Sequence, residues 1–379
     1  MVWWLVRGFG QSCRSQKGYD YLQKLTLVNI KLKWVKDRTL DEAVAGQRDL
    51  KAACTLVSII FSDSEDCVPI YRLRRQRRQL GIPDELKLSS FVRRYPSIFH
   101  ESSFLDSGGT PVPLFSLTPE AFSLHQEELR ILQQNQMDTV IRLQKLLMLV
   151  KDITLPLQTI NQLKWDLGLP HDYHQSLIPC FPELFSFVNL KDDRVGLKLL
   201  SWDSHLAVSH LQKNNEGASG DCLAFPIGFP RGYGLKRKCM EWLEEWQGLP
   251  YTSPYCDPSH LDPRTDISEK RIVGVFHELL HLTILKQTER KNVSNLRSPL
   301  RLPQKFTKVF ERHPSIFYIS KKIDTQTVVL REAYCGSELL EKHPLVEIRR
   351  RYAEMMKQGF LDRSRGLYRE ARDIEQEFE

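Results

Sequence analysis

Apolar side chains recur at helical spacing along most of the chain and give way three times to short runs in which apolar and polar residues alternate. The helical spacing predicts helices over 39–61, 68–80 and 84–95, the first opened by a capping box at Thr39 and Glu42. Alternating runs on both sides of the Gly-Gly in "LDSGGTP" then predict a β-hairpin. This part of the chain is therefore expected to form a group of helices closed by a hairpin.

The same order recurs twice further along the chain. In the second copy, helices are expected over 118–134, 136–150, 156–167 and 171–180, before a hairpin with the turn "KDDR". In the third copy, helices are expected over 267–287, 291–298 and 303–312, before a hairpin with the turn "IDTQ". Helices followed by a hairpin are the order of a winged-helix unit, so three such units are predicted.

A repeated phrase marks the junction between helices and hairpin in each copy: "YPSIF" at 95–99, "FPELF" at 181–185 and "HPSIF" at 313–317. Proline cannot continue a helix and biases its predecessor toward extended geometry, so it switches the chain into the first strand. The apolar residues that follow are predicted to anchor this strand in the core: Ile98, Phe99, Leu184, Phe185, Ile316 and Phe317. The phrase is interpreted as structural.

The predicted fold class is α+β, mostly helical, with three tandem winged-helix-like units. The predicted division is an organellar transit peptide at 1–30, units at 31–117, 118–202 and 266–335, a connector rich in proline and aromatic residues at 203–265, and C-terminal helices with a charged tail at 336–379. One clear helix, "KRKCMEWLEEWQ", is expected in the connector.

Composition narrows the class of protein. No run approaches the roughly 18 uninterrupted apolar residues that a membrane span needs, so no membrane span is predicted. The eight cysteines contain no Cys-x-x-Cys pair, which argues against a disulfide scaffold and a cysteine zinc site and favours a reducing compartment.

The net charge of +7 is concentrated in residues 1–100, which sum to +8 while the remainder sums to −1. The first residues carry Arg7, Arg14 and Lys17 among apolar side chains, with no acid before Asp20. This pattern is typical of an organellar transit peptide. The alternative is a disordered basic N-terminus with no targeting function. Arginine among bulky apolar residues, with few Ser or Thr, favours the mitochondrion over the chloroplast.

A second basic concentration is "YRLRRQRRQLG" at 71–81, followed by Arg93 and Arg94. Like charges three and four residues apart on a helix repel one another, so a bound anion would stabilise them. Phosphate is the anion that guanidinium groups bind best, through two parallel hydrogen bonds. A solvated charged face is the alternative. The candidate RNA-binding residues are Arg72, Arg74, Arg75, Arg77, Arg78, Arg93 and Arg94, followed by Lys236, Arg237 and Lys238 at the start of the connector helix. Tyr71 is a candidate for base stacking that the sequence does not distinguish from a core residue.

"HELLH" at 277–281 matches the His-Glu-x-x-His pattern of zinc hydrolases, in which the two histidines bind the ion and the glutamate acts as base. A zinc site needs a third protein ligand, for which the downstream candidates are Glu289, Glu311 and His313. The helix already carries a strong apolar stripe, and His313 takes the position of Tyr95 in the repeated phrase, where packing explains it. We therefore expect no metal, no cofactor and no catalytic residue.

Four stretches together resemble one protein family: "KWVKDRTLDEAV", "LPYTSPY", "EKRIVGVFHELLHLTILKQTER" and "HPLVEIRRRYAEMMKQG". They match, in order, the plant organelle RNA recognition (PORR) family over roughly residues 30–362. The resemblance implies an RNA-binding protein of plant mitochondria or chloroplasts that promotes splicing of group II introns. It also implies that the protein is not an enzyme, and the position of His281 is commonly not a histidine in this family.

The resulting hypothesis is that the tandem units bind organellar intron RNA, with other splicing factors as further partners, and hold it in a splicing-competent shape. Phosphate contacts would supply most of the affinity, and unpaired bases stacked on aromatic or arginine side chains would supply selectivity. Two alternatives stay open, a protein-interaction scaffold of organellar RNA complexes and a zinc hydrolase acting through His277, Glu278 and His281. DNA binding is a variant of the main hypothesis that sequence separates poorly from RNA binding.

Overall fold

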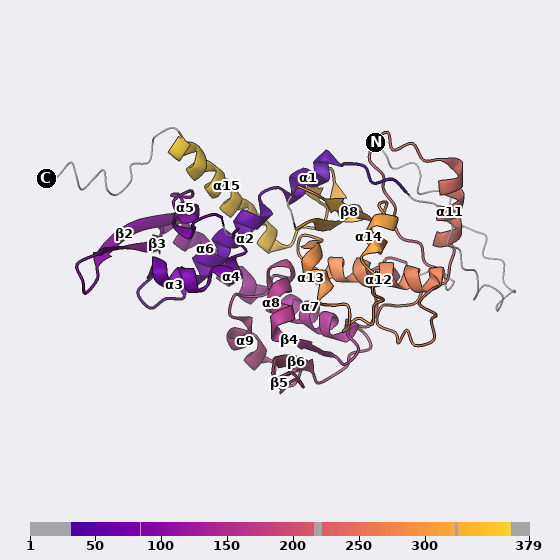
Figure 1. Cartoon of the computed structure of the whole chain (residues 1–379). Helices are drawn as coiled ribbons and strands as arrows, with labels where there is room; N and C mark the ends of the chain where they lie inside the picture. Colours follow the sequence, from indigo (N-terminus) through magenta and orange to yellow (C-terminus); the bar gives the residue numbers. More distant parts are fainter. Residues whose placement is uncertain (1–31, 84, 216–221, 323–324, 365–379) are drawn as a thin grey trace.

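The computed structural model describes residues 32–83, 85–215, 222–322 and 325–364, apart from the side chain of Arg78. The predicted transit peptide at 1–30 and the charged tail from 365 onward lie outside the described residues. Helices and small antiparallel sheets make up the described chain, so the predicted α+β class is confirmed (Figure 1). No helix in the described segments is long and apolar enough to cross a membrane.

Three stretches of chain share a common order of elements, in which a helix, a short strand and further short helices precede a β-hairpin. The first consists of α1 (Arg38–Val44), α2 (Gln47–Phe61), β1 (Cys67–Pro69), α3 (Ile70–Arg75), α4 (Arg77–Leu80), α5 (Leu88–Val92), β2 (Phe99–Leu105) and β3 (Pro111–Leu117). The second consists of α6 (Pro119–Gln134), α7 (Gln136–Leu149), β4 (Thr154–Pro156), α8 (Leu157–Leu167), α9 (Tyr173–Ser176), the 3₁₀ turn η2 (Ile178–Cys180), β5 (Phe185–Asn189) and β6 (Val195–Leu199).

Two helices that belong to none of the three stretches, α10 (His210–Lys213) and α11 (Arg237–Gln247), lie between the second and the third. The third stretch consists of α12 (Asp266–Leu282), β7 (Gln287–Glu289), α13 (Arg290–Ser294), α14 (Lys308–Arg312), β8 (Phe317–Ser320) and β9 (Thr327–Leu330). The chain then forms η3 (Arg331–Ala333), the paired strands β10 (Tyr334–Cys335) and β11 (Glu338–Leu339), and the long helix α15 (Pro344–Ser364).

Each predicted hairpin is confirmed, and each gains a third strand that the sequence did not predict. The strand orders are β1-β3-β2, β4-β6-β5 and β7-β9-β8, all antiparallel, so the three sheets share one topology. The added strands β1, β4 and β7 have three residues each, which is too short to produce a visible alternation of apolar and polar residues. The repeated topology agrees with three related units, while their identification as winged helices stays a prediction.

The repeated phrase has the structural role expected of it. Ile98, Phe99 and Phe185 are buried, as are Ile316 and Phe317. Leu184 is only partly buried, but it packs against the same core. Each of these side chains lies at the start of the first hairpin strand, so burial of the pair secures the hairpin on its helices.

The predicted first helix is wrong in two respects. Its N-cap is Asp37, whose carboxylate accepts from the backbone N–H of Leu40, rather than Thr39. The helix also ends at Val44, and α2 begins after Gly46, whose φ of 74° lies in the left-handed region that glycine adopts readily. The single helix predicted over 39–61 is therefore two helices, separated by Ala45 and Gly46.

Packing does not follow the order of the chain. Leu40 and Val44 of α1 pack against Tyr318 and Val329 of the third sheet. At the other end of the chain, α15 contributes Ile348, Tyr352 and Met356 to the core formed by the first stretch (Figure 1). The two ends of the described chain thus cross over, each packing on the stretch that is far from it in sequence.

Candidate nucleic-acid interface

Three arginines on α3 project into solvent beside an exposed aromatic ring. The side chains of Arg72, Arg74 and Arg75 are exposed, although Arg72 also forms an ion pair of 2.9 Å with Asp63. Tyr71 is 49% exposed, so it belongs to the surface and not to the core. We call Arg72, Arg74 and Arg75 the α3 cluster. It combines guanidinium groups and an aromatic face, the side chains that contact phosphates and bases in RNA complexes.

Two of the remaining arginines of this region, Arg77 and Arg93, have partners within the fold. The guanidinium of Arg77 donates to the carbonyl oxygens of Pro83 and Leu86, at 2.6 and 2.8 Å. Arg93 donates to both carboxylate oxygens of Glu101, at 2.6 and 2.5 Å. These contacts give Arg77 and Arg93 structural roles, because each guanidinium fixes a loop or a strand.

Two further candidates differ in what the structure says of them. The guanidinium of Arg94 lies 3.7 Å from Asp49 and its side chain is 36% exposed, so it borders the surface. The side chain of Arg78 lies outside the described part of the structure.

The second group of predicted cations lies far from the first. Lys236, Arg237 and Lys238 are exposed at the start of α11, and we call them the α11 cluster. Arg237 pairs with Glu241 one turn further along the helix, at 2.9 Å. In Figure 1, α3 and α11 lie at opposite ends of the molecule, so the fold does not bring the two clusters into one patch.

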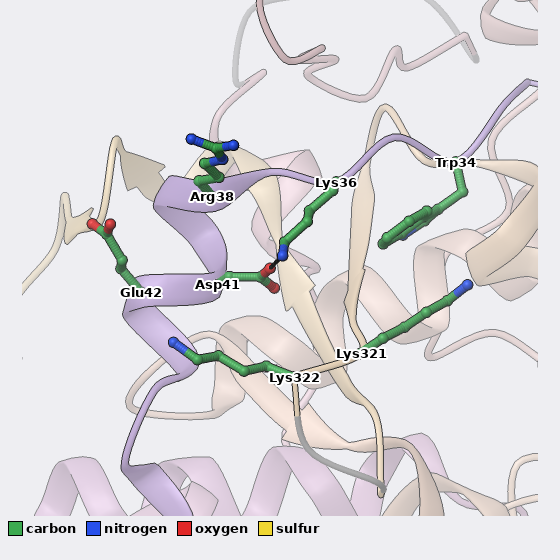
Figure 2. Close-up of a pocket in the computed structure, with 7 residues that line it drawn as sticks. All are labelled: Trp34, Lys36, Arg38, Asp41, Glu42, Lys321 and Lys322. Atoms are coloured by element: carbon green, nitrogen blue, oxygen red, sulfur yellow. Dashed lines mark ion pairs between the residues drawn. The ribbon is translucent and has the colours of Figure 1, made fainter.

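A third basic surface was not predicted. Residues between Trp34 and Glu42, together with two lysines that follow β8, line a pocket of about 500 Å³ (Figure 2). The lining residues are Trp34, Lys36, Arg38, Asp41, Glu42, Lys321 and Lys322. We call it the Trp34 pocket. The sequence signal was present in "KWVKDR", where cations flank a tryptophan, but nothing local indicates that the two lysines after β8 would join it.

The "HELLH" motif forms a buried cluster with a partner that was not predicted. The side chains of His277 and His281, on adjacent turns of α12, both approach Glu332 of η3. Their Nε2 atoms lie 2.5 and 2.7 Å from the same carboxylate oxygen, Oε1. Among the described residues, this is the one group in which three potential metal-ligand atoms lie close enough together to bind a single ion.

The three predicted third ligands lie elsewhere. Glu289 pairs with Lys291, Glu311 pairs with Arg290, and His313 lies 2.7 Å from Glu269. His313 is fully buried and its ring packs on Trp246, with ring centroids 4.3 Å apart. Packing therefore explains His313, as the repeated phrase predicted.

The distances around Glu332 fit hydrogen bonding better than a shared ion. Zinc binds nitrogen and oxygen ligands at about 2.0–2.2 Å in a tetrahedron, which places ligand atoms roughly 3.3–3.5 Å apart. The separations of 2.5 and 2.7 Å are shorter than that. Burial raises the pKa of Glu332, but the two histidines, of which His281 forms a hydrogen bond of 2.7 Å, outweigh it and lower the pKa to about 2. Burial lowers the pKa of His281 to about 3, so this ring is neutral at physiological pH.

Glu278, which would be the base in a hydrolase of this pattern, forms hydrogen bonds and an ion pair with other residues of the fold. Its Oε1 accepts from the hydroxyl of Tyr255 and pairs with Lys145, both at 2.7 Å, and its Oε2 accepts from the backbone N–H of His210 at 2.6 Å. Burial raises the pKa of this carboxyl, but Lys145 and the hydrogen bonds bring it below its usual value. A buried carboxylate with three partners has no geometry for activating water beside the histidines.

Comparison with known proteins gives a single consistent family. The family model described as the plant organelle RNA recognition domain matches residues 35–361. WHAT'S THIS FACTOR 9, mitochondrial, of Arabidopsis thaliana is 38% identical over 351 residues, which cover 89% of this chain and 88% of that protein. No solved structure matches the chain.

Two more distant relatives extend the comparison. WHAT'S THIS FACTOR 1, chloroplastic, of Zea mays is 32% identical over 323 residues, which cover 82% of this chain and 64% of that protein. The chain thus spans just under two thirds of the length of the maize relative. ROOT PRIMORDIUM DEFECTIVE 1 of Arabidopsis thaliana is 26% identical over 396 residues, covering 99% of this chain and 93% of that protein.

Proposed function

Because the chain belongs to the plant organelle RNA recognition domain family, we propose that it binds RNA in a plant organelle and promotes splicing of group II introns. It does so without catalysis, by holding intron RNA in a splicing-competent shape, with other splicing factors as further partners. The organelle is the mitochondrion, in keeping with the name of the Arabidopsis relative at 38% identity. The chloroplast is the alternative, because the maize relative is named chloroplastic.

The observation that carries RNA binding is the α3 cluster with its aromatic neighbour. Arg72, Arg74 and Arg75 are exposed within one short helix, and no side chain of the helix is acidic. Phosphate contacts release counterions from the RNA and so supply affinity without sequence preference. The exposed ring of Tyr71 adds a face on which an unpaired base can stack.

The test replaces Arg72, Arg74 and Arg75 together by glutamine and measures binding of a labelled group II intron RNA between 50 and 200 mM salt. If each arginine contacts one phosphate, the log–log salt slope falls in magnitude by about 2, since each phosphate contributes roughly 0.7 for a single strand. Arg77 is left unchanged because its guanidinium holds the carbonyl groups of Pro83 and Leu86.

The matched control removes the same charge from scattered positions. Lys305, Lys342 and Lys357 are exposed and lie on different elements or loops, so their triple glutamine variant lowers net charge equally without touching a cluster. We expect this control to weaken binding less than the α3 variant does. Equal losses would assign the effect to net charge alone, and wild-type protein without RNA affinity at 100 mM salt would instead favour a protein-interaction scaffold.

A further inference from the structure

The Trp34 pocket combines a flat aromatic wall with an excess of positive charge (Figure 2). Its volume of about 500 Å³ lies within the range of roughly 300–1,000 Å³ found for small-ligand sites. One side is the segment from Trp34 to Glu42, and the other is the pair of lysines after β8. The pocket is therefore built by two segments that are nearly 300 residues apart in sequence, as the hydrogen bond between Trp34 and Ile319 spans 285 residues.

The ring of Trp34 is held in place before any ligand arrives. Its indole Nε1 donates to the carbonyl oxygen of Ile319 at 3.0 Å. The ring lies nearly parallel to that of Tyr318, with an interplanar angle of 12° and centroids 6.2 Å apart. The side chain is only partly buried, so part of the ring borders the pocket. A ring fixed in this way loses little conformational freedom when a planar group stacks on it.

The charges around the ring favour an anion. Four cations and two carboxylates line the pocket, which leaves a net charge of +2. Asp41 has a structural task, because its Oδ1 accepts from the hydroxyl groups of Tyr318 and Ser320 at 2.9 and 2.6 Å. Glu42 is exposed and lies at the end of the pocket away from Trp34 in Figure 2.

A planar aromatic wall beside several cations matches a nucleotide, which has a flat base and a negatively charged phosphate. We propose that the Trp34 pocket binds one unpaired nucleotide of an RNA strand, with the base stacked on Trp34 and the phosphates on the surrounding cations. This inference rests on the proposed RNA-binding function and adds a subsite to it. Base stacking on an aromatic side chain tolerates any base, so the subsite selects single-stranded segments and not a sequence.

Lys321 occupies the place that the base would take. Its ammonium lies 4.2 Å from the centroid of the Trp34 ring, a cation–π contact at a solvent-accessible site. The flexible four-carbon stem of a lysine allows the ammonium to move from the ring to a phosphate. A stacked base contributes more than an exposed cation–π contact, so this exchange favours the bound state.

The first experiment measures binding of a labelled 20-nucleotide single-stranded RNA of mixed sequence and of the same sequence as a duplex. Trp34→Ala weakens single-strand binding by about 5- to 150-fold, the loss expected for one stacked base. It changes duplex binding little, because paired bases are not available for stacking. Trp34→Phe keeps an aromatic face and stays within a few-fold of wild type. Trp202, 46% exposed and outside the pocket, is the matched control, and Trp202→Ala leaves binding unchanged.

Two exposed charges provide variants that do not disturb the fold. Glu42→Gln removes a negative charge from the pocket and is expected to tighten single-strand binding by two- to fivefold at low salt, whereas Lys322→Gln weakens it by a similar factor. Opposite signs at two exposed positions are not explained by a loss of stability. Melting temperatures of all variants are recorded, because Trp34→Ala also removes the hydrogen bond to Ile319.

The outcomes separate this inference from the proposed function. Wild-type protein that binds neither RNA at moderate salt contradicts the proposed function and the subsite together. The subsite alone is overturned if the wild-type protein binds RNA, Trp34→Ala binds it with the same affinity, and Glu42→Gln and Lys322→Gln do not change the affinity in opposite directions. Equal weakening of single-strand and duplex binding by Trp34→Ala also overturns it, because the ring then contributes to the fold and not to stacking.

Discussion

Single residues in the buried cluster on α12 show how a catalytic pattern becomes a structural one. His277 and His281 have the spacing of metal ligands, yet both rings approach one oxygen of Glu332 at hydrogen-bond distances. The ring of His210 stacks on that of His281, with centroids 3.6 Å apart, and closes the cluster from another side. The two histidines of the motif therefore pack with the ring of His210 and the carboxylate of Glu332, and the glutamate of the motif faces a different set of partners.

His281 is expected to make the protein sensitive to acid. Its folded-state pKa of about 3 lies below the unfolded value of 6.5, so the unfolded state binds a proton that the folded state does not as pH falls from 6.5 toward 3. At pH 5 this linkage lowers the free energy of unfolding by about 2 kcal/mol relative to pH 7.5. His281→Gln removes this contribution, so urea denaturation should show a smaller loss of stability between pH 7.5 and pH 5 in the variant. An identical loss in both proteins would contradict the shift.

At the scale of elements, α15 is fitted to the first stretch of the chain at one glycine. A Cβ atom on Gly359 would lie 3.0 Å from Cβ and 3.1 Å from the backbone N of Ser97. Ser97 belongs to the first copy of the repeated phrase, and its hydroxyl donates to the carbonyl oxygen of Met355 on α15 at 2.6 Å. The phrase therefore serves a second purpose in this copy, as the point where the C-terminal helix docks.

Gly359→Ala separates helix propensity from packing. In the interior of a helix this change alone stabilises by about 1 kcal/mol, because alanine is the better helix former. The contact with the backbone of Ser97 is expected to reverse the sign and to destabilise by about 1–3 kcal/mol, as overpacking does. Chemical denaturation measures the effect, and Lys357→Ala on the exposed face of the same helix is the control. A stabilised Gly359→Ala protein would mean that α15 does not pack closely at this point.

The sequence predicted the elements that carry a long periodic signal and missed those defined by contacts. The hairpins and α6 to α8 follow from patterns of ten or more residues or from a clear turn. β1, β4 and β7 exist only because a hairpin lies beside them, and the break at Gly46 depends on where α1 and α2 pack. The same limit applies to the candidate sites. Exposed arginines in a charge run were predictable, whereas the roles of Glu332 and Lys321 depend on contacts far along the chain.

At the scale of the whole molecule, basic surfaces are distributed and not gathered into one groove. The α3 cluster and the α11 cluster lie at opposite ends of the molecule in Figure 1, and the Trp34 pocket is formed by the segment from Trp34 to Glu42 and the two lysines after β8. A single short oligonucleotide is therefore expected to engage part of this surface, and a folded intron RNA to engage more of it. Distribution of this kind favours recognition of RNA shape over a linear sequence.

Variants in the two clusters are expected to act independently on a long RNA. Triple glutamine replacement of the α3 cluster and of the α11 cluster should give losses of binding free energy that add within about 0.5 kcal/mol, as for distant sites without shared partners. With an 8-nucleotide RNA, which engages one cluster at a time, each single variant should lose little affinity because the other cluster still binds, and the combined variant should lose most of it. Competition binding with both RNAs measures this, and additivity with the short RNA would indicate that the clusters act on the same ligand.

The crossing of the chain ends also sets the order in which the molecule can fold. Trp34 bonds to Ile319 and Ser97 bonds to Met355, contacts that span 285 and 258 residues. Loops of this length close late in folding. Closing them lowers the conformational entropy of the chain before the stabilising contacts between its ends have formed. The apolar face of α1 and part of the first core therefore stay uncovered during folding until the last helices pack against them. During that interval the uncovered apolar faces are prone to aggregation, and a truncation before residue 344 removes α15 and leaves part of the first core uncovered.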